Sequence, residues 1–395
     1  MYRFGLVLEQ TLGHVAHGLN IERALAAEPD IQPEVIRVGF TEPAGIQRLP
    51  GLRTWSWRAS VTARNALRAR LRTGSLDAIF IHTQVAALLA GEIMRSVPTV
   101  VSLDATPRLF DREGAAYGHR RGPEVLEAIK RRFNARAFSS AARFVTWSQW
   151  AAYSLVADYG VSLDKIDVIP PGVDLNLFRP SLLGKQSERV RILFVGGQFE
   201  RKGGPDLLEA LVGLRDTVEL DIVTGDEVPA VPAGVRVRLH RGLKPQSEQL
   251  VALYRSADIF VLPSRGDCMP QAVIEAIACG LPVVGTRVGA IPEMVNDGVN
   301  GYLVPARDPR ALAAAIGALV QRPGRRHPMG RHSRVLAQQE YDADRNNHRI
   351  FGLMKSLAGD RGRSEKAGVT LDRPARTVAA GVRAGPIRGS PGVDR

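Results

Sequence analysis

Two stretches of the sequence place charged residues where they could bind a phosphorylated ligand. The first, FVGGQFERKGGPDLLEAL from Phe194 to Leu211, predicts a buried strand, a glycine-rich basic loop and a helix that begins near Pro205. Helix N-termini bind phosphate because their free N–H groups and the helix dipole favour negative charge. Arg201 and Lys202 would add two positive charges there, and Gly197 belongs to the same loop. The alternative is a glycine turn with solvated basic side chains, because short glycine patterns are weak signals.

The second stretch, PSRGDCMPQAVIEAIACGLPVVGT from Pro263 to Thr286, holds two carboxylates eight residues apart. A loop with Asp267 is expected after a strand, and a helix is expected to begin near Met269 or Pro270. Glu275 would then lie inside an apolar helix, where a carboxylate must find hydrogen-bond donors. Sugar hydroxyls are such donors. The alternative is that Glu275 caps a neighbouring loop and that Asp267 caps the helix.

Strands and helices alternate along the chain in two consecutive series. The run VRILFV at Val190–Val195 is typical of a strand buried in a parallel sheet. Ser148 and Asp308 are expected to cap helices. The pattern predicts an α/β fold with two doubly wound, Rossmann-like domains that face each other across a cleft. Further strands are expected over Tyr2–Leu8, Val35–Val38, Asp77–His82, Thr99–Leu103, Lys165–Ile169, Glu219–Val223, Val235–Leu239, Ile259–Leu262 and Pro282–Gly285.

The expected domain boundaries follow the breaks in this alternation. The first domain covers residues 1–172, a linker covers 173–188, and the second domain covers 189–335. Residues 336–358 are expected to form a C-terminal helix, for which packing back on the first domain is one arrangement. Residues 359–395 are rich in Gly, Pro and Arg without apolar periodicity, and they are expected to form a disordered basic tail.

Composition and charge limit the classes of partner. The chain has 395 residues, a formal net charge of +13 and a sequence pI near 10.3, so the candidate partners are phosphate-bearing ligands, nucleic acid or an acidic membrane face. No recognised nucleic-acid-binding motif occurs, and nucleic acid is not expected. Cys268 and Cys279 form no metal-binding or disulfide spacing. Neither a secretory signal nor a run of about 20 apolar residues is visible, so a cytoplasmic protein is expected.

Residues 48–72 form a basic segment with seven arginines, no acidic residue, and Trp55 and Trp57. Two interpretations remain open. One is a solvated basic helix whose tryptophans pack inward. The other is a surface that docks on acidic lipid, which would place the protein peripherally at the inner face of the membrane. A second basic run holds Lys130, Arg131, Arg132 and Arg136.

Together, these motifs resemble those of the retaining glycosyltransferases of family 4, which have the GT-B fold. The resemblance extends from about Phe4 to Leu353 and is strongest from Lys165 onward. Several such motifs in one order are more specific than any one of them alone. The resemblance rests on KIDVIPPGVDLNLF, on RKGGPDLLEAL and on LYRSADIFVLPSRGDCMPQAVIEAIACGLPVVGTRVGAIPEMVNDGVNGYLV.

The resemblance implies a role for each matching residue. Arg201 and Lys202 would hold the diphosphate of a nucleotide-sugar donor and stabilise it as a leaving group. Glu275 would bind the donor ribose, and Asp267 would bind hydroxyls of the transferred sugar. The other implied donor-binding positions are Gly13 in an N-terminal loop, Gly197 in the phosphate loop, and the turn formed by Met269, Pro270 and Gln271.

The sequence departs from the family pattern at two positions, Asp267 and Asp104. Asp267 stands where Glu is usual, which leaves the identity of the transferred sugar open. Asp104, in VVSLDATP, stands where the family often has His. Asp104 therefore joins the candidate site as a catalytic residue, and His14 joins it as a donor-binding residue. The histidines expected on nearby loops that could substitute are His14, His17 and His82.

The implied reaction moves a sugar from the donor to an acceptor hydroxyl with retention of anomeric configuration, as a hexosyltransferase does. Electrostatic stabilisation of the leaving diphosphate would be the main catalytic effect, and neither a cofactor nor a metal ion is expected. The acceptor is unknown, and envelope polysaccharide or glycolipid synthesis is the expected context. The alternatives are a non-catalytic sugar-nucleotide-binding protein and a GT-B nucleotide-sugar epimerase.

Overall fold

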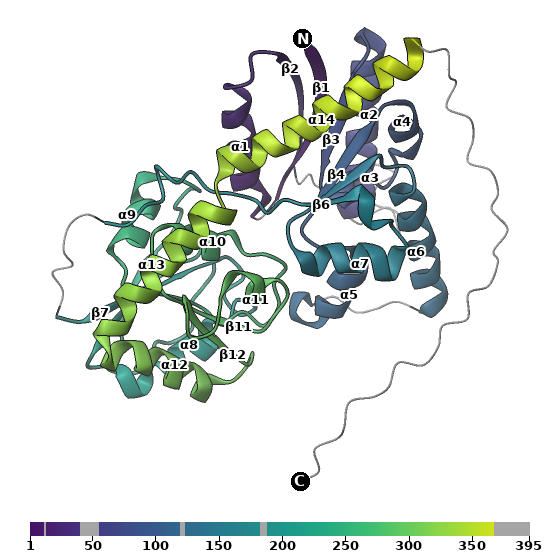
Figure 1. Ribbon diagram of the computed structural model, residues 1–395. Helices are drawn as coiled ribbons and strands as arrows, with labels where there is room; N and C mark the ends of the chain where they lie inside the picture. Colours follow the sequence, from purple (N-terminus) through teal and green to yellow (C-terminus); the bar gives the residue numbers. More distant parts are fainter. Residues whose placement is uncertain (12, 40–54, 119–122, 182–187, 367–395) are drawn as a thin grey trace, which may run out of the picture.

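Two α/β halves, each built on one sheet, make up the described part of the computed structural model (Figure 1). The structure describes residues 1–11, 13–39, 55–118, 123–181 and 188–366. The N-terminal sheet contains β1 (Tyr2–Gln10), β2 (Ile31–Gly39), β3 (Ala78–His82), β4 (Thr99–Leu103), β5 (Arg143–Thr146) and β6 (Ile166–Val168). The C-terminal sheet contains β7 (Val190–Val195), β8 (Val218–Val223), β9 (Arg236–His240), β10 (Ile259–Leu262), β11 (Val283–Thr286) and β12 (Gly301–Val304).

All neighbouring strands in both sheets are parallel. The N-terminal order is β2-β1-β3-β4-β5-β6, and the C-terminal order is β12-β11-β10-β7-β8-β9. Each order reverses once, between β1 and β3 in the first sheet and between β7 and β10 in the second. The predicted class, two doubly wound α/β sheets, is confirmed.

Helices surround the sheets and link successive strands. The N-terminal half has α1 (His14–Leu25), α2 (Trp55–Thr73), α3 (Gln84–Ala87), α4 (Gly91–Ser96), α5 (Pro107–Glu113), η2 (Gly114–Tyr117), α6 (Glu124–Phe138), α7 (Gln149–Tyr159) and η3 (Leu163–Lys165). The C-terminal half has α8 (Gly204–Ala210), η4 (Val212–Leu214), α9 (Glu248–Ser256), α10 (Gln271–Ala278), α11 (Ile291–Met294), α12 (Pro309–Gln321) and α13 (Pro323–Glu340), and α14 (Ala343–Lys366) follows.

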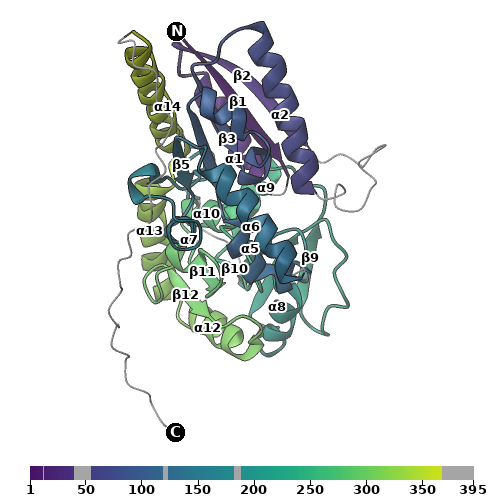
Figure 2. The ribbon, with the colours of Figure 1, turned by 90° about the vertical axis from the view of Figure 1, so that its right-hand side faces the viewer.

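Both faces of the N-terminal sheet are covered, which explains its uninterrupted apolar strands. Side chains alternate between the two faces of a strand. On β3, Ile79 and Ile81 pack with α2, whereas Phe80 packs on the other side with Phe351 of α14. Figure 2 shows α2 and α14 on opposite sides of this sheet.

Two predicted helix caps are confirmed. The Ser148 hydroxyl accepts a hydrogen bond from Ala151 N at 3.1 Å at the start of α7. Asp308 Oδ1 accepts one from Ala311 N at 2.9 Å at the start of α12. These side chains satisfy N–H groups that a helix terminus leaves unpaired.

The C-terminal helices differ from the expected boundaries. The boundary placed at residue 335 falls inside α13, and the chain crosses between the halves at residues 341–343. Residues 359–366, expected in the disordered tail, belong to α14, because Ile350, Phe351 and Met354 anchor this helix on the N-terminal sheet. Figure 1 shows α13 on the C-terminal half and α14 on the N-terminal half. Residues 367–395 lie outside the described residues.

Candidate functional site

The candidate site begins where the order of the C-terminal sheet reverses. β7 lies between β8 and β10, so the loops after β7 and β10 leave the sheet side by side. Open α/β sheets bind ligands at the carboxyl ends of strands at such a switch point. The loop after β7 carries Arg201 and Lys202, and the loop after β10 carries Asp267. The fold therefore brings together residues that are 65 positions apart in the chain.

Lys202 and Asp267 form a buried ion pair. Lys202 Nζ donates to Asp267 Oδ2, and Arg201 Nη1 lies 3.8 Å from the same oxygen. Ser264 Oγ donates to that oxygen at 3.2 Å. Burial lowers the pKa of Lys202, although attraction to Asp267 opposes this shift. Two cations that face one carboxylate leave an excess of positive charge, which an anionic ligand would neutralise.

Arg201 is fixed by contacts from both halves of the molecule. Its Nε donates to Gln198 Oε1 at 2.6 Å, and its Nη1 donates to the Gly266 carbonyl. The guanidinium carbon lies 4.4 Å from the ring centre of Tyr117, which belongs to η2 of the N-terminal half. A cation over an aromatic face is attracted by the ring quadrupole. The orientation of Arg201 is therefore set before any ligand binds.

One glycine allows the basic loop to approach β10. Gly203 has a φ of +76°, and a Cβ atom there would lie 1.9 Å from the Pro263 carbonyl oxygen. Only glycine fits both the left-handed backbone and this close approach. A Cβ on Gly197 would meet no atom within 4 Å, so the other side of the loop is open.

The turn before α10 and the loop before α1 meet across the two halves. Pro270 occupies the N-cap position of α10, so the alternative that Asp267 caps this helix is wrong. Met269 and Gln271 are buried, and neither amide atom of Gln271 has a hydrogen-bond partner among the described residues. A Cβ on Gly13 would lie 3.6 Å from Gln271 Cγ. The structure therefore brings Gly13 to the start of α10.

Glu275 lies in α10 and is 6% exposed. Burial raises the pKa of Glu275 to about 7, and the neighbouring Tyr254 hydroxyl on α9 acts in the opposite direction. A carboxylate in such surroundings is stabilised by ligand groups that donate hydrogen bonds to it.

A cluster of histidines occupies the switch point of the N-terminal sheet. His14 Nδ1 lies 3.1 Å from His82 Nε2, and the other nitrogen, His14 Nε2, lies 3.9 Å from Asp104 Oδ2. Burial raises the pKa of Asp104, while His14 opposes the rise. His14 is therefore the histidine that faces Asp104, the residue that follows β4.

The other two histidines are packing residues. The His17 and His82 rings lie 5.1 Å and 5.5 Å from the Trp147 ring. Burial lowers the pKa of His17 to about 3 and also lowers that of His82, so both are neutral at pH 7. The expectation that these histidines lie on loops was wrong for His14 and His17, which belong to α1, whereas His82 ends β3, as the predicted strand Asp77–His82 implied.

A segment of the N-terminal half that the sequence did not reveal also reaches the site. Tyr117 Oη lies 3.8 Å from Cys268 Sγ. A Cβ on Gly266 would lie 2.3 Å from Ala116 Cβ, so η2 rests directly on the loop after β10. The pKa of Glu113 is raised by burial and by Asp267. No motif marks residues 113–117, because their role depends on contact with the other half.

Within the described residues, no group of three or more His, Cys, Asp or Glu side chains is arranged to hold a metal ion. The charged groups that contact one another at the centre of the site are Lys202, Arg201 and Asp267.

Comparisons with known proteins cover both halves of the chain. Residues 13–177 match the family model "Glycosyltransferase Family 4", and residues 189–322 match the model "Glycosyl transferases group 1". A D-inositol 3-phosphate glycosyltransferase of Paenarthrobacter aurescens is 30% identical over 295 residues, which cover 69% of this chain and 71% of that protein. Its counterpart in Xylanimonas cellulosilytica is 35% identical over 211 residues, and there the match spans about half of each protein, 48% and 51%.

Solved structures share the architecture at low sequence identity. Sucrose-phosphate synthase from Thermosynechococcus elongatus has a TM-score of 0.76 and 17% identity, with 91% of this chain and 100% of that chain covered. Anabaena HepE in complex with UDP-glucose has a TM-score of 0.63 and 18% identity, with coverage of 90% and 100%. These two likenesses concern the fold.

The two family models, the relative matched over more than two thirds of its length, and the two doubly wound sheets lead to one assignment. The chain belongs to the family 4 glycosyltransferases and has the GT-B fold.

Proposed function

We propose that this glycosyltransferase takes a sugar from a nucleotide-diphosphate donor and transfers it to an acceptor hydroxyl with retention of anomeric configuration. The supporting observation is the cluster of Arg201, Lys202 and Asp267 at the switch point of the C-terminal sheet. A diphosphate carries the negative charge that the two cations would neutralise. HepE, which shares the fold, is solved with UDP and with UDP-glucose.

In this proposal, donor binding exchanges one set of contacts for another. Lys202 turns from Asp267 to the diphosphate, and the freed Asp267 carboxylate accepts hydrogen bonds from sugar hydroxyls. Glu275 accepts hydrogen bonds from the ribose hydroxyls. The unpaired amide of Gln271 gains a partner on the donor, which offsets the cost of its burial.

The proposed chemistry requires little covalent participation by the protein. The bond between the anomeric carbon and the phosphate oxygen breaks, and the acceptor oxygen bonds to the same face of that carbon. The departing phosphate oxygen takes the proton of the acceptor hydroxyl. Arg201 and Lys202 stabilise the charge that develops on the diphosphate. The step as written uses neither a carboxylate nucleophile nor a metal ion.

The acceptor would bind to the N-terminal half, beside the switch point of its sheet. His14 and Asp104 lie there, next to Gly13, and they would orient the acceptor hydroxyl. The relatives named above are inositol phosphate glycosyltransferases. For this chain we propose a hydroxyl acceptor of envelope polysaccharide or glycolipid synthesis.

Transfer assays on two variants test the site. A thermal-shift panel of UDP-, GDP- and ADP-sugars first identifies the donor, since a ligand that binds only the folded state raises the melting temperature. Lys202→Ala and Glu275→Ala should then each reduce transfer by about a hundredfold or more, because each removes a contact to the donor. Lys244→Ala, which changes an exposed lysine, is the charge-matched control for Lys202→Ala. Wild-type rates in both site variants would refute the assignment.

The same assays separate the proposal from its alternatives. A transferase releases free nucleotide only when an acceptor is present. A nucleotide-sugar epimerase converts the donor without any acceptor. A sugar-nucleotide-binding protein gives a large thermal shift and no turnover.

Three side chains of α2, the helix expected to contact a membrane, have partners within the protein. Trp55 of α2 donates to Glu9 Oε1 at 3.3 Å and packs against the N-terminal core. Arg68 and Arg70 of the same helix are ion-paired. No helix among the described residues is long and apolar enough to cross a bilayer. Arg48 and Arg53 also belong to the basic segment of residues 48–72, but they lie outside the described residues.

We propose that α6 is the surface that contacts an anionic membrane. Val125, Ile129 and Phe133, four residues apart on one helix face, are 72%, 48% and 52% exposed. Arg132 and Arg136 lie on the same face, three residues beyond Ile129 and Phe133, and both are exposed. An apolar stripe with flanking arginines suits the boundary between lipid headgroups and acyl chains.

Vesicle co-sedimentation tests this surface. Ile129→Ser with Phe133→Ser should weaken binding to vesicles containing phosphatidylglycerol at least about tenfold, because two apolar side chains no longer leave water. The control is Val231→Ser with Leu239→Ser, which changes exposed apolar residues of the other half. Equal binding by both double variants, or no preference of the wild type for anionic vesicles, would contradict the proposal.

A further inference from the structure

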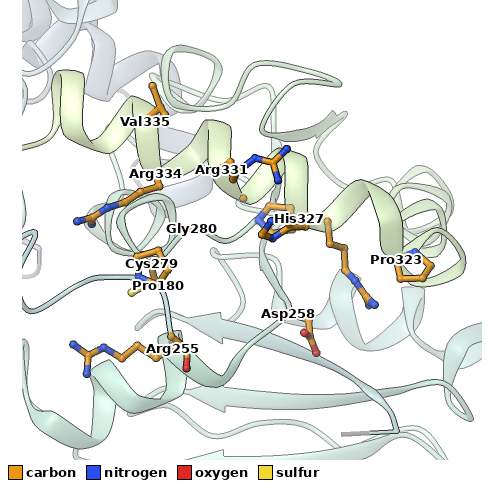
Figure 3. A pocket seen from close by; sticks show the side chains of 14 residues that line it. Pro180, Arg255, Asp258, Cys279, Gly280, Pro323, His327, Arg331, Arg334 and Val335 are labelled. Atoms are coloured by element: carbon orange, nitrogen blue, oxygen red, sulfur yellow. The ribbon is translucent and has the colours of Figure 1, made fainter. Parts of the chain in front are cut away.

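A pocket lies on the C-terminal half, between α13 and the turns that lead into β10 and β11 (Figure 3). Its volume is about 500 Å³, which is within the range of about 300–1,000 Å³ that small-molecule sites occupy. Figure 3 shows side chains of α13 on one side and Arg255 and Asp258 on the other. The residues that line it on α13 include Pro323, Arg326, His327, Gly330, Arg331 and Arg334.

This pocket is separate from the candidate active site. Asp258 directly precedes β10, and Pro282 directly precedes β11, so the pocket lies at the amino ends of these strands. The active site lies at the carboxyl ends, where Asp267 follows β10. A four-residue strand spans about 13 Å. The two sites therefore lie at opposite ends of the strands of one sheet.

Two glycines shape the pocket where α10 ends. A Cβ on Gly330 of α13 would lie 2.2 Å from the Gly280 carbonyl oxygen, and a Cβ on Gly280 would lie 3.1 Å from Pro180 Cγ. Gly280 also has a φ of +70°, which favours glycine. Side chains at these positions would disturb the wall, so the shape of the pocket depends on their absence.

Four arginines and one aspartate line the pocket, so its walls are strongly cationic. Arg334 is occupied as a structural residue, because its Nη1 donates to the carbonyls of Phe178 and Ala278 at 2.8 Å. Asp258 Oδ2 accepts a hydrogen bond from Arg191 N at 2.9 Å.

Arg326 is the residue that points to a ligand. The Nη1 atom of this partly exposed side chain is itself buried, and that atom has no hydrogen-bond partner among the described residues. A buried charged donor without a partner is unfavourable, and an anion would satisfy it. Arg331 and His327 line the same space, and α13 has no acidic residue before Glu340. Asp258 is the one carboxylate among the lining residues, against four arginines, so positive charge is in excess there.

We propose that this pocket binds a phosphate-bearing compound, with Arg326 and Arg331 as the contacts to the phosphate oxygens. Planar guanidinium groups bind phosphate with paired, charge-assisted hydrogen bonds. The phosphate belongs either to a free metabolite or to a lipid headgroup. The inference is independent of the proposed donor.

Calorimetric titration of the full chain with inorganic pyrophosphate tests the site. Because pyrophosphate would also bind near Lys202, the titration is carried out in the Lys202→Ala background. Adding Arg326→Gln and Arg331→Gln should weaken the remaining binding about tenfold or more. The charge-matched control adds Arg236→Gln and Arg310→Gln, which alter exposed arginines elsewhere. Unchanged affinity in the Arg326 and Arg331 variant, or an equal loss in the control, overturns the proposal.

Two further measurements complete the test. Crystals of the wild type soaked with tungstate should show an anomalous peak at Arg326, and a peak only near Lys202 overturns the proposal without depending on the folding of any variant. Glucose 6-phosphate and vesicles containing phosphatidic acid distinguish the sources. Competition of glucose 6-phosphate with pyrophosphate supports a free metabolite, and competition by the vesicles alone supports a headgroup.

Discussion

At the scale of single residues, the candidate site is a set of charges held together before a ligand arrives. Asp267 accepts a hydrogen bond from Lys202, and its Oδ2 lies 3.8 Å from Arg201 Nη1. One carboxylate therefore partly compensates the charge of two cations. In the absence of a ligand, Asp267 acts as the counter-ion and keeps Arg201 and Lys202 in place. A bound diphosphate would replace that counter-ion with more negative charge. Lys202 and Asp267 therefore act as a unit, although each belongs to a different loop.

Glu275 gives a pH-dependent prediction at this scale. Burial raises its pKa from 4.5 to about 7, so the folded protein holds this proton more tightly than the unfolded chain. The free energy of unfolding must then fall as the pH rises from about 4.5 to about 7. Glu275→Gln lacks this titration. Between pH 5 and pH 8 the wild type should lose about 2.5 kcal/mol more stability than Glu275→Gln.

Urea denaturation of both proteins at each pH measures this difference. Glu248→Gln, on the exposed face of α9, is the matched control and should follow the wild type. Parallel stability curves for the wild type and Glu275→Gln would show that Glu275 is ionised in the folded protein at pH 5.

At the scale of elements, the segment of α5 and η2 contributes to the candidate site, which the sequence did not predict. Its residues Ala116 and Tyr117 belong to the N-terminal half and contact Gly266 and Arg201 of the other. The ring of Tyr117 covers one side of the Arg201 guanidinium, while Gln198 holds its Nε. Tyr117 is therefore a positioning residue for the basic loop.

Substitution of Tyr117 should affect donor binding more than turnover. Tyr117→Ala removes a cation–π contact worth about 0.5–2 kcal/mol, so the KM for the donor should rise about 2- to 30-fold with a smaller change in kcat. Tyr117→Phe keeps the ring and should remain close to the wild type. Tyr153→Ala, which alters a tyrosine that is 72% exposed, is the control. An equal loss in the Phe and Ala variants would assign the effect to the hydroxyl beside Cys268.

At the scale of the molecule, two crossings of the chain join the halves. Val173 N donates to the Tyr341 carbonyl at 2.9 Å, and Ala343 N donates to the Val173 carbonyl at 3.1 Å, so the crossings lie side by side. Away from them, Glu293 of α11 accepts hydrogen bonds from Gln149 N and Trp150 N at the start of α7. Gly13 and Tyr117 also contact the C-terminal half, so several contacts besides the two crossings join the halves.

Much of this organisation follows from the sequence alone. The apolar runs at Val190–Val195 and Ile259–Leu262 matched strands residue for residue, because a strand covered on both faces needs continuous apolar side chains. The caps Ser148 and Asp308 were identified because capping is local chemistry. The sequence also placed Arg201 and Lys202 after a strand and Glu275 in an apolar helix, since these positions depend only on neighbouring residues.

Tertiary structure alone decided which distant groups meet. The pairing of Lys202 with Asp267, the contact of Tyr117 with Arg201 and the selection of His14 as the neighbour of Asp104 leave no local pattern. They depend on strand order and on the docking of one half against the other. The extent of α14 was not predicted for the same reason, because its burial depends on a sheet that residues 2–168 form. Periodicity reports the neighbours of a residue along the chain, whereas packing selects its neighbours in space.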